Sequence, residues 1–183
     1  DQDILIGSAV NALNPKLNGG AGVTCCTWIK PTVITAGATE NVLLNVIIDG
    51  TTSGFRLSID GDTSKIRQAG RSVVTDGANA SNSGSALTTN IWYFVAGVLD
   101  YATDNVIVYL NDERTVTAAT FANASWTAGT ATTTYDAIGA THTTVPAITT
   151  EFTGIMGDLL LFSRVLSVSE VARVKQNLKW RYQ

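Results

Sequence analysis

Short apolar runs recur along the whole chain, and turn residues such as Gly, Asn, Asp and Thr separate them. This spacing is typical of a β-sandwich or barrel, because most runs are long enough for a strand and too short for a helix. Asp60-Gly61 and Asn111-Asp112 are pairs that favour tight turns between antiparallel strands. The candidate strands are Ile4–Val10, Val23–Lys30, Val42–Asp49, Gly54–Asp60, Ser64–Gln68, Ser72–Thr75, Ile91–Leu99, Asn105–Asn111, Arg114–Thr117, Tyr135–Ala140 and Gly154–Phe162.

One helix is predicted, directly after the last strand. Ser167-Val168-Ser169-Glu170 fits a capping box, in which the Ser hydroxyl takes a free helix N–H and the Glu reaches back. Val171, Val174 and Leu178 then recur at helical spacing. We expect a short helix whose apolar stripe covers a sheet edge or opening.

The run Ile91–Leu99 is nearly continuous in apolar residues, which is typical of a strand covered on both faces.

Length and composition indicate one domain over residues 1–183 with a sizeable core. Hydrophobic residues make up 45% of the chain, whereas charged residues make up only 15% and the net charge is -3. The absence of a Lys/Arg cluster argues against a nucleic-acid partner. No apolar run reaches the roughly 18 residues of a membrane-spanning helix. The chain begins at Asp1 without Met, so a missing signal peptide says little about location.

The two cysteines, Cys25 and Cys26, are adjacent. On a strand their side chains point to opposite faces, and a disulfide between neighbours would be strained. We expect reduced, partly buried thiols. His142 is the single histidine. It is interpreted as a surface residue, because the chain offers it neither further metal ligands nor a Gly-flanked Ser nucleophile nearby.

Two long polar stretches, Val74–Leu87 and Ala119–Tyr135, are interpreted as surface loops that are functional or simply mobile. Sugar binding commonly uses an aromatic ring beside amide and carboxylate groups. Trp126 in the second stretch is the candidate platform; the alternative is a ring tucked against its own domain. The candidate ligand-binding residues are Trp126, Asn123, Asp136, Asp76, Asn79 and Asn82.

Three segments resemble motifs of LamG-like domains in the concanavalin A-like lectin/glucanase superfamily. "FTGIMGDLLLFSRVLSVSEV" is similar to the closing F-x-G-x-I-D-E-V-R-I-Y-N-R-x-L-S-x-x-E-I. "WYFVAGVLD" with "YLNDERTV" is similar to W-x-x-V-A-x-x-x-D followed by Y-L-N-G-x-x-V. "CCTWIKPT" resembles the early I-S-A-W-V-K-P strand.

The resemblance implies an all-β, concanavalin A-like jelly-roll sandwich of two antiparallel sheets with a short C-terminal helix. The chain departs from the pattern at Met156-Gly157-Asp158, where the family has I-D-E, and at Leu160, where the family has a polar residue. Leu160 and Phe162 would lie on the face opposite Leu159 and Leu161. They are covered by the helix or a loop, or they form a contact surface for another subunit.

Retaining glucanases of this superfamily carry an E-x-D-x-E strand, since residues two apart point the same way and hold two carboxyls about 5 Å apart. None of the four glutamates, Glu40, Glu113, Glu151 and Glu170, has an acidic residue two positions on. The sequence therefore argues against an enzyme. LamG domains often use calcium; Asp100 and Asp104 could supply oxygen ligands, and a solvated loop is the alternative.

These observations favour a non-catalytic recognition or adhesion domain that binds glycans through end loops or the concave sheet. No cofactor is required in this interpretation, and calcium stays an option. A second hypothesis is a structural surface protein of an assembly, such as a phage capsid decoration or fibre domain, packing through Leu160 and Phe162. A third is a glycoside hydrolase whose acids come together only in the fold. Either leading hypothesis places the chain outside the cell or on a virion or cell surface.

Overall fold

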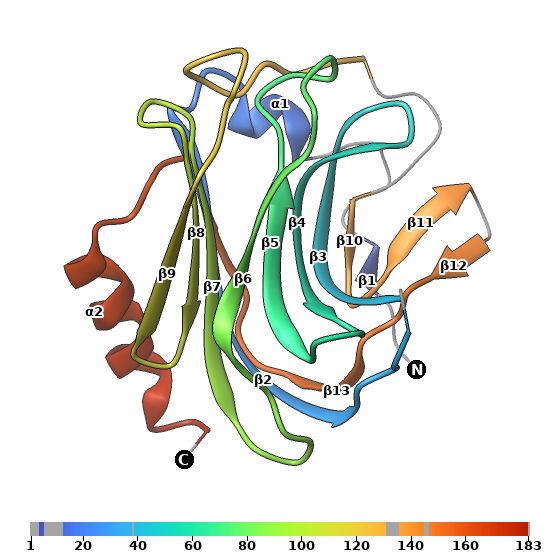
Figure 1. The fold of residues 1–183 in the computed structure, drawn as a ribbon, viewed down its shortest axis with the longest axis vertical. Coiled ribbons are helices and arrows are strands. Elements are labelled where there is room, and N and C mark those ends of the chain that lie inside the picture. Colours follow the sequence, from blue (N-terminus) through green and yellow to red (C-terminus); the bar gives the residue numbers. More distant parts are fainter. Residues whose placement is uncertain (1–3, 6–12, 38, 131–135, 145–146, 183) are drawn as a thin grey trace.

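The computed structural model describes residues 4–5, 13–37, 39–130, 136–144 and 147–182. Within these ranges the chain forms two antiparallel sheets that pack face to face (Figure 1). The front sheet has the order β1 (Ile4–Leu5), β10 (Ala137–Ile138), β3 (Glu40–Asp49), β4 (Thr52–Asp60), β5 (Lys65–Gly70) and β6 (Asn79–Ala86). The back sheet has the order β13 (Thr153–Met156), β2 (Gly22–Val33), β7 (Tyr93–Asp100), β8 (Asn105–Leu110) and β9 (Glu113–Ala118).

The remaining elements lie around this sandwich. β14 (Leu160–Phe162) also pairs with β2, on the edge that β13 occupies. β11 (Thr141–Thr144) and β12 (Ala147–Thr149) form a separate hairpin. α1 (Asn14–Leu17) is a single turn, and α2 (Val168–Lys179) is the C-terminal helix. The predicted all-β sandwich with a C-terminal helix is confirmed. No helix within the described residues is long and apolar enough to cross a membrane.

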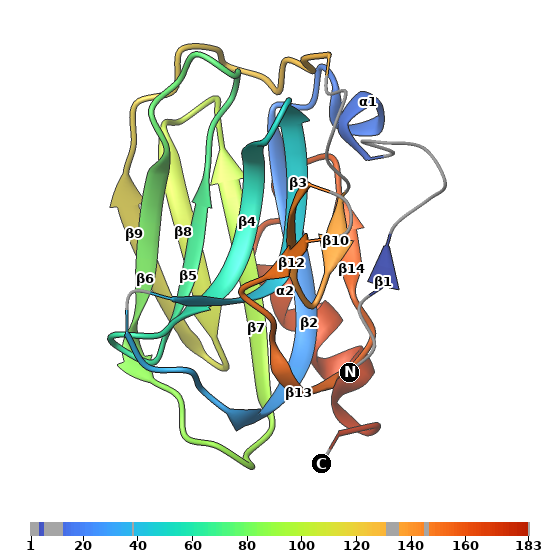
Figure 2. The same ribbon diagram turned by 90° about the vertical axis from the view of Figure 1, so that its right-hand side faces the viewer.

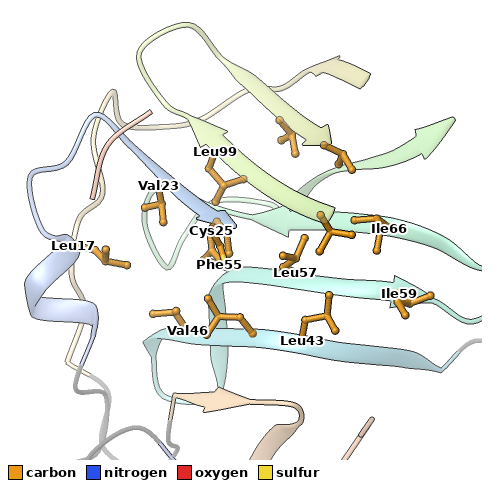
Figure 3. Close-up of a cluster of buried hydrophobic side chains, with 14 of the residues drawn as sticks. Leu17, Val23, Cys25, Leu43, Val46, Phe55, Leu57, Ile59, Ile66 and Leu99 are labelled. Carbon is orange, nitrogen blue, oxygen red and sulfur yellow. The ribbon is translucent and has the colours of Figure 1, made fainter. Parts of the chain in front are cut away.

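The main core fills the space between the sheets (Figure 3). It forms because apolar residues alternate along the strands: Phe55, Leu57 and Ile59 of β4 point inward and are fully buried. Each such side chain contributes about 1.5–3 kcal/mol relative to an exposed position. Arg56, between Phe55 and Leu57, therefore faces outward from the front sheet, where it is available to other contacts.

A second core lies between the back sheet and α2, which occupies the left side in Figure 1. Strand β7 serves both cores, since Val95 and Leu99 face the front sheet while Phe94 and Val98 face the helix. This confirms the strand covered on both faces. The helix covers the outer face of a sheet rather than an edge or opening, which corrects that expectation.

The helix begins as the sequence predicts. Ser167 Oγ accepts a hydrogen bond from the Glu170 amide at 3.3 Å, and the Ser167 amide donates to Glu170 Oε2 at 2.8 Å. Phe162 packs against the helix-side core, whereas Leu159 and Leu161 pack against the main core. Phe162 is thus half-buried by contacts within the domain, and Leu160 is half-buried as well. This arrangement matches the first of the two interpretations of Phe162.

Cys25 and Cys26 point to opposite faces of β2, as predicted, with Cys25 in the main core and Cys26 in the helix-side core. Both are free and fully buried, which is deeper than expected. Burial raises the pKa of Cys26 to about 12, and burial together with the neighbouring Cys26 raises the pKa of Cys25 well above its usual value.

Because the thiolate is the reactive form and neither sulfur is exposed, we expect both cysteines to resist alkylation in the native protein. Iodoacetamide labelling at neutral pH, followed by mass spectrometry, should be on the order of 1,000-fold slower than in urea-unfolded protein, since reaction requires opening of the core. A native thiol that reacts at the rate of the unfolded chain would contradict the burial of that cysteine.

Several local differences from the sequence expectations have physical causes. Residues 79–86, expected to lie in a loop, form strand β6, and Ser72–Thr75, expected to be a strand, forms turns. The final strand is interrupted between β13 and β14. There the Gly157 amide donates to the Trp28 carbonyl at 2.7 Å, and a Cβ on Gly157 would lie 2.4 Å from the Tyr182 ring. The interruption therefore makes room for the C-terminal tail.

Candidate functional site

The outer face of the front sheet carries a polar cleft of about 360 Å³. Its volume is within the range of small-molecule sites, about 300–1,000 Å³. The cleft extends from the β3–β4 turn to the end of β5, and small side chains form part of its lining. The lining residues are Glu40, Thr51, Thr52, Ser53, Arg56, Arg67, Ala69, Gly70, Arg71 and Ala78.

Strand register brings these residues together. Arg56 of β4 lies opposite Asn45 of β3 and Ala69 of β5. Cross-strand partners share a face, and side chains alternate along a strand, so Arg56 points away from the core that holds Phe55 and Leu57. By the same rule Arg67 projects on this outer face. Figure 2 shows how β4 and β5 lie side by side in the front sheet.

One carboxylate joins two guanidinium groups in the cleft. Glu40 Oε2 lies 2.9 Å from Arg56 Nη1, and Glu40 Oε1 lies 3.2 Å from Arg67 Nε. Arg56 also donates to Ser53 Oγ at 2.6 Å and to Asn45 Oδ1 at 3.4 Å. Three arginines face a single glutamate, so the cleft has a formal positive charge although the chain is net negative.

A second hollow of about 210 Å³ adjoins the cleft and shares Glu40 and Arg67 with it. Its lining is acidic, through Glu40, Asp60 and Asp62. Asp60 Oδ1 accepts hydrogen bonds from the amides of Asp62 and Thr63, and Asp60 Oδ2 lies 3.6 Å from Arg67 Nη1. Burial raises the pKa of Asp60, but these hydrogen bonds and the Arg67 charge outweigh it, so the net shift is downward. Asp60 is therefore held as a carboxylate.

Two of the predicted ligand residues lie in the interior. Trp126 is only 1% exposed, and its Nε1 donates to Asn14 Oδ1 at 2.6 Å. Asp136 is fully buried and accepts hydrogen bonds from the amides of Leu13 and Ile47 at 2.7 and 2.8 Å. A sugar platform needs an exposed ring face, so the expectation that Trp126 binds sugar is corrected. The ring is packed against its own domain, which was the alternative interpretation. The Asp136 carboxylate is likewise used for the fold.

Three further candidates hold loop segments together. Asp76 is 9% exposed, and its carboxylate accepts from Ser72 and from the Ala122 amide. Burial raises the pKa of Asp76, but these hydrogen bonds exceed that effect and lower it. The backbone amide of Asn123 donates to Ser72 Oγ. The side chain of Asn79 donates from Nδ2 to the Thr120 carbonyl oxygen and accepts at Oδ1 from the Thr120 backbone amide.

Asn82 is the predicted residue that shares a face with the cleft. It lies in β6 opposite Arg67 of β5, on the outer side of the front sheet. The cleft residues Glu40, Arg56, Arg67 and Arg71 were not among the ligand-binding residues predicted from the sequence. Two of them could have been found from the sequence. The Asp60-Gly61 turn predicts that the strands before and after it pair, and Arg56 and Arg67 occupy positions of these strands that face away from the core.

The calcium candidates lie at the β7–β8 turn. Asp100 Oδ1 accepts from the Thr103 amide at 3.2 Å, and Asp104 Oδ1 accepts from the Phe121 amide at 3.0 Å. Among the residues that the structure describes, no group of three His, Cys, Asp or Glu side chains is close enough to hold a metal ion. Calcium binding at this turn stays a prediction. His142 lies in β11, but its side chain falls outside the described residues.

The sandwich, its C-terminal helix and the polar outer face define a lectin-like fold. A family model described as the concanavalin A-like lectin/glucanases superfamily, of the laminin G type, matches residues 6–172, and the chain belongs to this family. Among curated protein sequences, none matches the chain at a significant level.

Solved structures agree on the fold. A carbohydrate-binding module of the Ruminococcus gnavus IT-sialidase, bound to α2,3-sialyllactose, is similar with a TM-score of 0.65 and 15% identity, over 95% of this chain and 96% of the module. A heptameric SAP-like pentraxin from Limulus polyphemus has a TM-score of 0.64 and 16% identity, over 84% of this chain and 69% of the pentraxin. Botulinum neurotoxin type C, whose cell entry depends on two ganglioside molecules, has a TM-score of 0.59 and 11% identity, over 96% and 39%.

Proposed function

We propose that this chain is a non-catalytic glycan-binding domain that uses the cleft on the front sheet. The observation that carries the proposal is a hollow of suitable volume lined by guanidinium, hydroxyl and carboxylate groups on a rigid sheet. Such groups form the directional hydrogen bonds that sugar hydroxyls require. The carbohydrate-binding module from R. gnavus, which shares this fold, supports the same class of ligand.

The arrangement of the acids favours recognition over hydrolysis. Glu40 and Asp60 are cross-strand partners and both line the hollow beside the cleft, so they form a pair of carboxylates on the outer face. Both contact Arg67, and the pKa of Asp60 is lowered. A general acid needs a raised pKa, so Asp60 does not fit the role of the acid in a retaining glycosidase.

The assembly hypothesis has less support from the geometry. It relied on an apolar surface at Leu160 and Phe162, and Phe162 is half-buried against the helix-side core. A role as a virion structural protein therefore stays a prediction without a specific contact. For a glycan-binding domain, we place the chain outside the cell or on a cell or virion surface.

A bulky side chain on the cleft lining should abolish binding. Ala69 projects into the cleft, and Trp is tolerated on strands, so Ala69→Trp fills the site while the core stays intact. We expect the wild type to bind glycans on an array and by isothermal titration with a Kd of about 1 mM or tighter, and the variant to bind at least about tenfold more weakly.

The matched control is Ala102→Trp, which adds the same bulk at an exposed position in the β7–β8 turn. It should bind like the wild type. Equal binding by Ala69→Trp and the wild type would move the site away from the cleft. No binding by the wild type across a broad array would overturn the proposed function, and release of reducing sugar from a bound glycan would overturn its non-catalytic part.

A further inference from the structure

The cleft contains hydrogen-bond donors that the protein itself does not use. Arg67 Nε and Arg71 Nε are buried and have no hydrogen-bond partner among the described residues. Arg67 Nε is near Glu40 Oε1, at 3.2 Å, but its N–H is not directed at that oxygen. Buried charged donors without an acceptor are costly, and both guanidinium groups are therefore short of acceptors. The two Nε atoms are themselves covered, so a ligand in the cleft would bond to the other nitrogens of these guanidinium groups.

The other charged groups of the cleft, Arg56 and Glu40, are already paired. Arg56 donates to Glu40, Ser53 and Asn45, and both oxygens of Glu40 lie against arginines. Arg71 donates Nη1 to the carbonyl oxygen of Asp76 at 3.0 Å, which fixes the guanidinium beside the cleft. Arg67 Nη1 lies 3.6 Å from Asp60 Oδ2, which is an ion pair without a hydrogen bond. Arg67 and Arg71 therefore hold the donors that remain for a ligand.

We infer that the cleft selects a sugar that bears a carboxylate, and that Arg67 and Arg71 bind this group. The inference rests on the proposed glycan-binding function and specifies its ligand class. A guanidinium presents a planar pair of donors that matches the two oxygens of a carboxylate, and such charge-assisted bonds are roughly twice as strong as neutral ones. Ser53, Thr51 and Thr52 lie on the same lining and can contact sugar hydroxyls.

The surroundings favour a single acidic sugar over a polyanion. The adjoining hollow is lined by Glu40, Asp60 and Asp62 and would repel a second negative charge placed in it. The chain as a whole is net negative, so long-range attraction of a highly charged polymer is not expected either. One carboxylate at the arginine end, with neutral sugars toward the acidic end, fits the distribution of charge.

The test compares acidic and neutral ligands on the wild-type protein by isothermal titration. The probes are α2,3-sialyllactose, a glucuronic-acid disaccharide, lactose and lactose sulfate. We expect at least one carboxylated sugar to bind at least about tenfold more tightly than lactose, and this advantage to shrink with added salt. Arg67→Gln and Arg71→Gln should each bring the affinity for the carboxylated sugar down to nearly the affinity for lactose.

Two further variants separate the ion contact from general effects. Arg173→Gln removes the same charge at an exposed position on α2 and should bind like the wild type. Arg67→Lys keeps the charge without the planar fork and should lose nearly as much as Arg67→Gln. The Arg67 side chain is 35% exposed, so thermal unfolding should show both substitutions at that residue to be folded.

The outcomes distinguish this inference from the function on which it rests. Lactose bound as tightly as the carboxylated sugars overturns the inference and leaves glycan binding intact. Lactose sulfate bound more tightly than every carboxylated sugar overturns the choice of carboxylate. If both glutamine variants keep full affinity for the carboxylated sugar, its carboxylate binds elsewhere than at Arg67 and Arg71, and the inference is overturned. No binding of any sugar by the wild type overturns the inference and the proposed function together.

Discussion

Trp126→Ala is expected to lower the free energy of unfolding by about 3–5 kcal/mol, the usual cost of removing a large aromatic side chain from a core. The ring is 1% exposed, and it lies so close to Gly54 that a Cβ there would be 2.3 Å from Trp126 Cη2. Gly54 has no side chain that could move into the space left by the ring. Urea unfolding followed by far-ultraviolet circular dichroism measures the loss without relying on tryptophan fluorescence.

The indole N–H adds to this effect. It donates to Asn14 Oδ1 at 2.6 Å, and Asn14 Nδ2 donates to the carbonyl oxygens of Ile48 and Gly129. Asn14 thereby links α1, β3 and the segment after β9, which passes over the top of the sandwich in Figure 1. Trp126→Phe keeps most of the packing and leaves this acceptor unpaired, so it should cost about 1–3 kcal/mol.

Ligand binding gives the decisive comparison between the two interpretations of Trp126. A core residue predicts that the folded fraction of Trp126→Ala binds glycans as the wild type does. A sugar platform predicts the reverse, with loss of binding and little loss of stability. Unfolding within about 1 kcal/mol of the wild type would contradict the buried position of the ring.

The strands that the sequence predicted well are those whose burial follows hydrophobicity. Phe55, Leu57 and Ile59 alternate with polar residues, and that alternation is the pattern of a strand with one face in a core. The capping box at Ser167 was equally legible, because its residues are local in sequence. The fold class, the helix start and the opposite faces of the two cysteines all depended on local patterns.

Strand β6 could not be recognised in this way, because its residues are Asn, Ala, Ser and Gly. Ser81 and Ser83 are buried although they are polar, so the alternation exists in burial and not in hydrophobicity. The strand is held by backbone pairing with β5, and Ser83 Oγ accepts a hydrogen bond from the Ile66 amide. Tertiary context here outweighs weak strand propensity.

The cleft was missed for a related reason. Arg56 lies between Phe55 and Leu57, and Arg67 follows Ile66. A charged side chain at such a position is ordinarily interpreted as facing solvent. Their relation to Glu40 depends on the pairing of β3 with β4, and that register shifts between Val42 and Leu44. Polar loops, by contrast, drew attention to Trp126 and Asp136, which the fold uses to close one end of the sandwich.

Asp136→Ala is expected to destabilise the protein strongly, because one carboxylate serves two backbone groups. It accepts from the amides of Leu13, just before α1, and Ile47 in β3. Each N–H left without an acceptor costs about 1–3 kcal/mol, so the loss should be about 2–6 kcal/mol.

The pH dependence of Asp136→Asn tests the same contacts by their charge. Burial raises the pKa of Asp136, and the two amide hydrogen bonds oppose it without cancelling it. The native state therefore holds this proton more tightly than the unfolded chain does. The contribution of the group to stability is full below the ordinary value of 3.8 and is lost as pH rises through the folded pKa. The stability of the wild type relative to Asp136→Asn should thus decline from about pH 4 upward.

Asp62→Ala, at an exposed aspartate, is the matched control for Asp136→Ala and should cost less than about 0.5 kcal/mol. If the wild type instead gained on Asp136→Asn as pH rose, the hydrogen bonds would outweigh burial, and the carboxylate would be stabilised in its charged form.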